Sequence, residues 1–525
     1  MKIHRYFNVL LTAMIIILYS CSGPLNEAGN NLEKGFMDPP ESAKPRVWWH
    51  WMNGNITKEG IRADLEWMSR TGIGGFQNFD ASLTTPQIVE KRLIYMTPEW
   101  KDAFRFTTRL ADSLGLEMAI AGSPGWSESG GPWVIPAQAM KKLVWSEVRI
   151  DEGKSFDGII PNPPATSGVF QNIPAQSRIP EPLPEYYKDI AVLAYRLPAS
   201  DLSMKELNPR VSSSEGKFSL TDLTDGDLTN NTFLPAARTN NKSWIMFEFA
   251  KPLKVQSLTL VSSEQGINYG PGKNRMLEAS DDGRQFNPVF EIPGPSNIPR
   301  TYTFPAVTAK FFRISFITPE LPARPGFIPP PASGSPPPPP PPPPGVRIAE
   351  VILHSVARLN RSEDKAGFTS AFGLYDLATL PISAEDAVNK SDIIDLTDKM
   401  GSDGRLTWTP AEGRWKIIRF GYSLTGRQNH PASPEATGLE VDKLDAGHVK
   451  AYFENYLDQY KDATGGLMGS RGLKYIIIDS WEAGVQNWTD SMLVEFRKHR
   501  GYDMLPCMPV LTGQIIESAD ASEKF

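Results

Sequence analysis

The chain has 525 residues, of which 40% are hydrophobic and 22% charged, and its 54 basic and 60 acidic residues leave a net charge of −6. This balance is typical of a folded, water-soluble chain of about three domains, and it excludes disordered and multi-span membrane proteins. The net negative charge also argues against a nucleic-acid-binding protein, which needs cationic side chains to contact phosphates. Composition does not distinguish an enzyme from a binding protein.

The N-terminus has the pattern of an export signal. Basic side chains precede an apolar stretch, residues 9–19, that is too short to cross a bilayer as a helix. The stretch leads to Cys21 in a sequence similar to a bacterial lipobox, in which the cysteine is lipidated and becomes the first residue. We predict a lipoprotein signal peptide over 1–21, a tether over 22–45, and a location in the periplasm or on the outer membrane, anchored by lipid alone. The alternative is a plain cleaved signal peptide with an incidental cysteine.

Strand and helix patterns alternate over residues 46–140, which we interpret as the first part of a (β/α) barrel. Apolar runs predict strands at 47–51, 72–79 and 116–121, and amphipathic spacing with capping residues predicts helices at 58–70 and 97–114. Three strand–helix repeats of this length indicate a parallel sheet, either open or closed into a barrel.

The pattern changes to β over the middle of the chain. Short alternating runs separated by turn sequences predict a β-rich insertion over 141–200, a β-sandwich over 201–360 and a β-rich connection over 361–414. Nine consecutive prolines, residues 336–344, cannot join a sheet. We therefore predict an extended polyproline loop before a late strand of the sandwich.

The strand–helix alternation resumes over residues 415–525, where we predict the continuation of the barrel, truncated in this chain. Its strands are predicted at 415–422 and 474–479, and its helices at 445–460 and 489–500. We count five strand–helix units in all, whereas a (β/α)8 barrel of the TIM type has eight. The predicted fold class is α/β plus β: a partial TIM-type barrel interrupted by β-sandwich material, either incomplete in this chain or an open sheet.

Aromatic and polar side chains follow the predicted strands, where parallel α/β sheets gather the residues that contact ligands. Aromatic rings can stack on the apolar faces of sugar rings, and amides and carboxylates can bind sugar hydroxyls. This set therefore indicates a glycan site. His50 is equally consistent with a packed core histidine, and Glu128 with a solvated loop carboxylate. The candidate binding residues are His50, Asn53, Asn78, Trp126, Glu128, Trp133 and Trp481.

Glu482 is the candidate general acid of a glycoside hydrolase, an enzyme that needs one carboxyl to protonate the leaving oxygen and a second to activate water or attack carbon. It follows a predicted buried strand and lies beside Trp481, which could exclude water and raise its pKa. A structural salt bridge is the alternative. Asp479 and Glu440 are candidate metal ligands, with structural roles left open. No motif of a zinc protease, nucleotide-binding loop or serine hydrolase is present.

Four separated segments resemble glycoside hydrolase family 106, the α-L-rhamnosidases. They are VWWHWMNGNITKEGIRADLEWMSRTGIGG at 47–75, PGWSESGGPW at 124–133, TGLEVDKLD at 437–445 and DSWEAGVQNWT at 479–489. The resemblance implies a (β/α)8 barrel interrupted by β-domains, calcium-assisted inversion at the rhamnose carbon, and rhamnose-containing glycans of plants or microbes as substrates. It also implies Glu482 as general acid. A looser resemblance of residues 215–360 is to a discoidin-like galactose-binding sandwich.

The resemblance does not supply a catalytic base. Members of the family are longer than this chain, and their base lies in the later part of the barrel. We therefore expect the base to be absent from this chain, which would be the N-terminal part of an inverting α-L-rhamnosidase and possess uncertain activity as a fragment. The alternative function is a non-catalytic glycan-binding lipoprotein.

Overall fold

The computed structural model describes residues 32–525 with the exception of Thr84, 174–183, 238–241, 266–273, 319–342, 371–376 and Asp479. Cys21, the predicted signal peptide and most of the proline run lie outside the described residues. The chain divides into two compact units. The first unit is Met1–Ser129, Asn429–Thr437 and Phe453–Trp481, and the second is Gly130–Gln428, Gly438–Tyr452 and Glu482–Phe525. No helix in the described part of the chain is long and apolar enough to cross a membrane.

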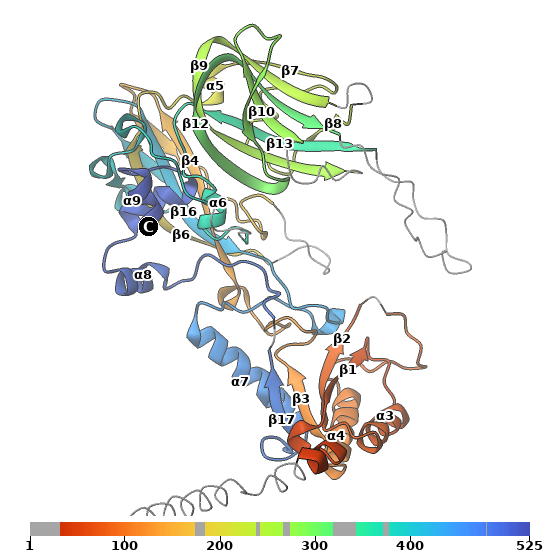
Figure 1. Cartoon of the computed structure of the whole chain (residues 1–525). Helices are drawn as coiled ribbons and strands as arrows, with labels where there is room; N and C mark the ends of the chain where they lie inside the picture. Colours follow the sequence, from red (N-terminus) through yellow and green to blue (C-terminus); the bar gives the residue numbers. More distant parts are fainter. Residues whose placement is uncertain are drawn as a thin grey trace, which may run out of the picture. The chain divides into compact units, whose positions relative to one another are not determined.

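A parallel sheet forms the first unit. Its four strands are ordered β1 (Arg46–Met52), β2 (Gly75–Ala81), β3 (Glu117–Ala121) and β17 (Leu473–Ile477), and each pairs in parallel with its neighbour. Figure 1 shows β17, drawn in blue near the end of the chain, beside the orange β3. The predicted parallel pairing of the first three strands is confirmed.

Two helices connect the first three strands, and both begin at a threonine. Helix α3 (Lys58–Arg70) starts after Thr57, whose hydroxyl accepts a hydrogen bond from the Gly60 amide, and α4 (Pro98–Ser113) starts after Thr97. Such caps satisfy amide groups that a helix leaves unpaired. The buried rings of Trp51, Trp100 and Phe104 pack one face of the sheet against α4, with centroids 4.9–5.8 Å apart. Burial of each such ring stabilises the fold by roughly 1.5–3 kcal/mol.

An antiparallel sheet lies in the second unit, in the order β14 (Ile394–Asp395), β6 (Tyr187–Arg196), β16 (Trp415–Leu424) and β4 (Lys141–Ile150). Strand β16 pairs antiparallel with both β4 and β6. The prediction that residues 415–422 form a strand of the parallel barrel was therefore wrong. Every residue of β16 is buried. A strand that is covered on both faces can have parallel or antiparallel partners, and its own sequence pattern does not distinguish them.

The predicted sandwich region is a seven-stranded antiparallel sheet wrapped around one apolar core in the second unit. Its strands are β7 (Arg210–Ser213), β8 (Thr232–Pro235), β9 (Lys242–Gln265), β10 (Arg275–Ser280), β11 (Asn287–Glu291), β12 (Ser296–Ile317) and β13 (Gly345–His354). Strand β9 pairs with β12 along most of its 24 residues through register shifts.

The remaining elements of the second unit are short. Strand β5 (Phe156–Ile159) pairs with β15 (Arg405–Trp408), and the end of the chain carries α8 (Met492–Arg500) and α9 (Ala519–Lys524). Helix α7 (Ala446–Ala463) is divided between the two units. The predicted helices at 445–460 and 489–500 are confirmed, the second with a start three residues later than expected.

Candidate functional site

An aromatic cluster covers one face of the parallel sheet in the first unit. Trp48 and His50 alternate along β1 with Trp49 and Trp51, which face the helices, so the first two point to the opposite face. The His50 ring stacks on Phe79 at 4.9 Å, and Trp126 meets both rings edge-on at 5.8 and 6.2 Å. We call Trp48, His50, Phe79 and Trp126 the aromatic face. Burial lowers the pKa of His50, so its ring is neutral at pH 7.

Trp126 is held in place by its own loop. Its amide donates to the carbonyl of His430 at 3.1 Å, and the Asn429 amide donates to the Pro124 carbonyl at 2.8 Å. Gly125 has a φ of +81°, and a Cβ there would lie 2.5 Å from the His430 carbonyl carbon. Only glycine fits this close approach. The loop after β3 is thus fixed by a segment some 300 residues later, which no local pattern predicts.

The two predicted asparagine ligands differ in their surroundings. The Asn53 amide donates to the Thr85 carbonyl at 2.7 Å and accepts from Arg92 at 3.3 Å, so it anchors the loop after β2. Asn78 is 2% exposed and lies opposite Trp49 in the β1–β2 register. Its side chain therefore belongs to the helix-facing layer, away from the aromatic face. This corrects the expectation that Asn78 faces a ligand, because a strand pattern gives alternation but not which face is covered.

The surroundings of Trp481 and Glu128, two other predicted residues of the first unit, differ from those expected. Trp481 is 60% exposed, whereas an indole that excludes water from a neighbouring acid would be buried. Glu128 is buried, at 8% exposure, so the solvated-loop alternative does not hold for it. Asp479 lies outside the described residues.

The second unit contains Glu482, Trp133 and Glu440. Glu482 is half-buried and is the first residue of the last segment of the second unit, Glu482–Phe525. Trp133 is also half-buried, and its ring stacks on Tyr452 with centroids 6.1 Å apart and an interplanar angle of 26°. The predicted site residues therefore divide between the units. The first holds the aromatic face and Glu128, and the second holds the candidate acid and Trp133.

Glu440 pairs with a lysine of its own loop. Its carboxylate accepts a hydrogen bond from the Lys443 ammonium at 2.8 Å, and the neighbouring Asp442 accepts from Lys141 at 3.1 Å and from Thr489 at 2.8 Å. Calcium takes six to eight oxygen ligands, and an ammonium group competes for the same carboxylate charge. Among the described residues no group of three His, Cys, Asp or Glu side chains could hold a metal. The residues present fit loop anchoring, and the calcium dependence implied by the family stays untested.

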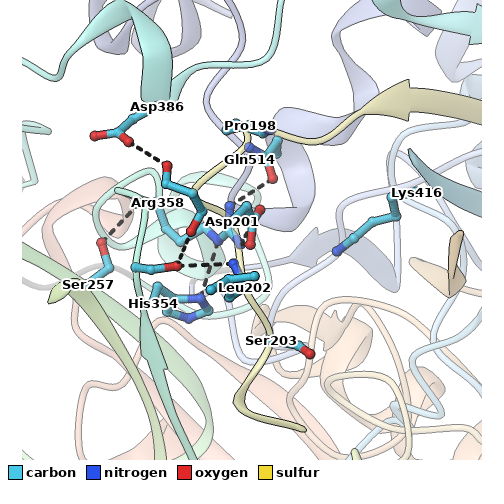
Figure 2. Close-up of polar contacts among 12 residues, drawn as sticks. Pro198, Asp201, Leu202, Ser203, Ser257, His354, Arg358, Asp386, Lys416 and Gln514 are labelled. Atoms are coloured by element: carbon cyan, nitrogen blue, oxygen red, sulfur yellow. Dashed lines mark hydrogen bonds and ion pairs between the residues drawn. The ribbon is translucent and has the colours of Figure 1, made fainter. Parts of the chain in front are cut away.

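A second buried cluster of charged groups was not predicted from the sequence. Figure 2 shows Arg358 between Asp201, Gln514 and His354. Its guanidinium donates to both Asp201 oxygens at 3.1 and 2.9 Å and to Gln514 at 2.9 Å. Burial, with the nearby Arg358 charge, holds the pKa of His354 well below its usual value, so the neutral ring accepts from Arg358 at Nδ1, at 3.3 Å. Since its charges are matched and buried, the cluster joins parts of the second unit rather than binding a ligand.

Comparison with known proteins identifies the family. The sequence pattern of glycoside hydrolase family 106, described as alpha-L-rhamnosidase, matches residues 37–525. A solved rhamnosidase from Novosphingobium sp. PP1Y is 41% identical, with a TM-score of 0.78 over 94% of this chain and 43% of that one. A protein of Formosa agariphila, provisionally named a beta-glucuronidase, is 25% identical over 99% of this chain and 30% of its own length. This chain thus spans less than half of each relative, and by its match over residues 37–525 it belongs to the α-L-rhamnosidase family of glycoside hydrolases.

Proposed function

We propose that this protein hydrolyses α-L-rhamnosidic linkages in rhamnose-containing glycans of plants or microbes. The observation that carries the proposal is the 41% identity to a rhamnosidase across nearly the whole chain. The relative named as a glucuronidase is less similar, at 25% identity. We therefore propose rhamnosides rather than glucuronides as the substrate class. The aromatic face of the first unit supports the proposal, because flat apolar rings suit the apolar face of a deoxyhexose.

Glu482 would deliver the proton to the leaving oxygen in an inverting mechanism. Its side chain is half-buried, which leaves the carboxyl accessible to a substrate. Inversion also needs a second carboxylate about 6.5–9.5 Å away to activate water.

The parallel sheet would belong to a (β/α)8 barrel. Strand β17 pairs only with β3 among the described strands, and its edge is apolar and exposed: Tyr475 is 50%, Ile477 41% and the following Ile478 50% exposed. At the other edge, Trp48 on β1 is 66% exposed. Soluble proteins seldom leave apolar strand edges uncovered. Further strand–helix units between these two edges would bury them and close a barrel.

The protein would be exported and anchored by lipid at Cys21. The basic and apolar N-terminal pattern with a cysteine at its end supports this assignment. Metabolic labelling with radioactive palmitate tests it. The wild-type protein should carry the label and the Cys21→Ser variant should not, and equal labelling of both would contradict the lipid anchor.

The experiment for the reaction compares wild type with Glu482→Gln in the intact protein on two rhamnosides. Methyl α-L-rhamnoside has a poor leaving group, which needs a proton as it departs. Loss of a general acid should therefore lower its turnover about 10²–10⁴-fold. A dinitrophenyl rhamnoside, whose leaving group needs no proton, should lose far less. A merely structural role would lower both equally. Glu412→Gln, an exposed carboxylate of the second unit, is the matched control.

Two further readouts separate the alternatives. Proton NMR of the first-formed sugar should detect β-L-rhamnose, the inverted anomer, and the α-anomer would contradict inversion. Hydrolysis of aryl glucuronides but not rhamnosides would overturn the substrate class. Glycan binding without any hydrolysis by the intact protein would favour the non-catalytic glycan-binding lipoprotein.

A further inference from the structure

A cavity of about 630 Å³ lies within the second unit, and its wall includes none of the residues labelled in Figure 2. Its wall is formed by the end of β9 with Ser262 and Glu264, the start of β12 with Arg300, and later segments with Phe368, Arg427 and Gly484. A neighbouring hollow of about 270 Å³ shares Ser262 with it. Volumes of this size are typical of sites for small ligands.

The charges around the cavity leave an excess of positive charge. Glu264 is the acidic residue of its wall, and Arg275 donates to that carboxylate at 3.1 Å. Arg300 lies 3.7 Å from Asp364, whose closer partner is Arg361. In the described part of the chain, no acid forms an ion pair with Arg427, although this residue is half-buried. An anion entering the cavity would therefore meet two guanidinium groups that protein carboxylates neutralise incompletely.

Arg427 is held in position by packing. Gly484 has a φ of +75°, and a Cβ at that position would lie 2.8 Å from Nε and 3.1 Å from both Cζ and Nη2 of Arg427. The guanidinium plane thus rests against a glycine backbone. The Arg427 backbone is fixed as well, since its carbonyl accepts from the Glu440 amide at 2.8 Å. A guanidinium fixed in this way is ready to bind a carboxylate through two parallel hydrogen bonds.

The rest of the wall has the chemistry of a sugar site. Hydroxyl and amide groups from Ser262, Asn297 and Thr369 alternate with the apolar surfaces of Phe368 and Ile298. Phosphate sites, by contrast, are built mainly from charged side chains and backbone amides. We propose that this cavity binds a uronate unit of a glycan, with the sugar carboxylate on Arg427 and its hydroxyls on the polar groups.

The test titrates methyl α-D-galacturonide and methyl α-D-galactoside into the protein by calorimetry, since the two differ only in a carboxylate in place of a hydroxymethyl group. The galacturonide should bind at least 10-fold more tightly. Arg427→Gln should lower its affinity about 10-fold or more and Arg427→Lys somewhat less, because lysine keeps the charge but not the planar fork. Gly484→Ala should weaken binding by displacing the guanidinium.

Arg405→Gln, an exposed arginine of the same unit, should bind like wild type and is the matched control. Circular dichroism of each variant confirms folding. Equal affinity for the two sugars, or unchanged binding in a folded Arg427→Gln protein, would overturn the proposal. Competition by inorganic sulfate as strong as that by the galacturonide would also overturn it, in favour of a general anion site. This experiment measures uronate binding and not hydrolysis. A negative result would therefore overturn the uronate site without affecting the proposed hydrolysis of rhamnosides.

Discussion

The Arg358 guanidinium binds both carboxylate oxygens of Asp201, at 2.9 and 3.1 Å, where neither side chain has more than 9% of its surface exposed. Arg149 adds a third contact to the same carboxylate at 3.1 Å. A buried pair of this kind adds little net stability when intact, but loss of one partner leaves an uncompensated charge. Disruption of the Asp201–Arg358 pair should therefore lower the stability of the second unit more than the intact pair raises it.

Asp201→Ala should destabilise the protein by about 3–5 kcal/mol, because Arg358 would stay buried without its partner. Urea denaturation followed by tryptophan fluorescence measures this change. Asp157→Ala is the control, since that carboxylate is exposed and its contact with Arg405 is 3.5 Å long. It should cost about 0–1 kcal/mol. Equal effects of the two substitutions would contradict the assigned role of Asp201.

The same pair predicts a sensitivity to acid. Burial by itself would raise the pKa of Asp201, but the Arg358 and Arg149 charges outweigh it and hold the pKa well below its usual value. A lowered carboxyl pKa stabilises the fold at pH values above the unfolded pKa of about 3.9 and is lost as the pH falls toward the folded value. The wild type should lose more stability than Asp201→Asn between pH 5 and pH 2. A parallel loss in both proteins would contradict this.

For Asp80 in the first unit we predict the opposite dependence of stability on pH. Burial raises its pKa to about 7, despite a 2.7 Å hydrogen bond from the Trp100 indole that lowers it. The folded state therefore binds the proton more tightly, and stability falls as the pH rises from about 4 through 7. Asp80→Asn keeps an acceptor for Trp100 and removes the charge.

Thermal denaturation should find Asp80→Asn more stable than wild type at pH 8, by up to about 4 kcal/mol, and nearly equal at pH 4. Asp102→Asn, an exposed acid on α4, should have no such pH-dependent effect. A difference that does not change with pH would mean that Asp80 is ionised throughout.

Glu440→Gln should lower thermal stability to the same extent in calcium and in a chelator. The substitution removes the carboxylate charge that pairs with the partly buried Lys443 ammonium, a loss of up to about 3 kcal/mol. Differential scanning fluorimetry with 5 mM calcium or EDTA (roughly saturating for either reagent) provides the measurement. If calcium raises the melting temperature of wild type but not of Glu440→Gln, then Glu440 is a ligand after all.

Trp126→Ala should raise KM for an aryl rhamnoside about 2- to 10-fold and change kcat little. An aromatic contact contributes about 0.5–1.5 kcal/mol beyond its buried area, which corresponds to this range. Trp67→Ala on α3, whose ring is 51% exposed, is the matched control and should leave KM unchanged. A lower kcat at unchanged KM would place Trp126 outside sugar binding.

The sequence by itself determined the elements that depend on neighbouring residues. The spacing of Ile61, Leu65 and Met68 and the caps at Thr57 and Thr97 are local signals, and the helices that they predict are present. Motif resemblance also supplied the family and the candidate acid Glu482, which no local periodicity identifies.

Only the tertiary structure decided which strands pair and which charges meet. A buried strand such as β16 has the same sequence pattern in a parallel and an antiparallel sheet, so its partners β4 and β6 could not be predicted from it. Asp201 and Arg358 are 157 residues apart. Charge neutralisation and burial arise from contacts between distant segments, and they therefore become visible only when the chain is folded.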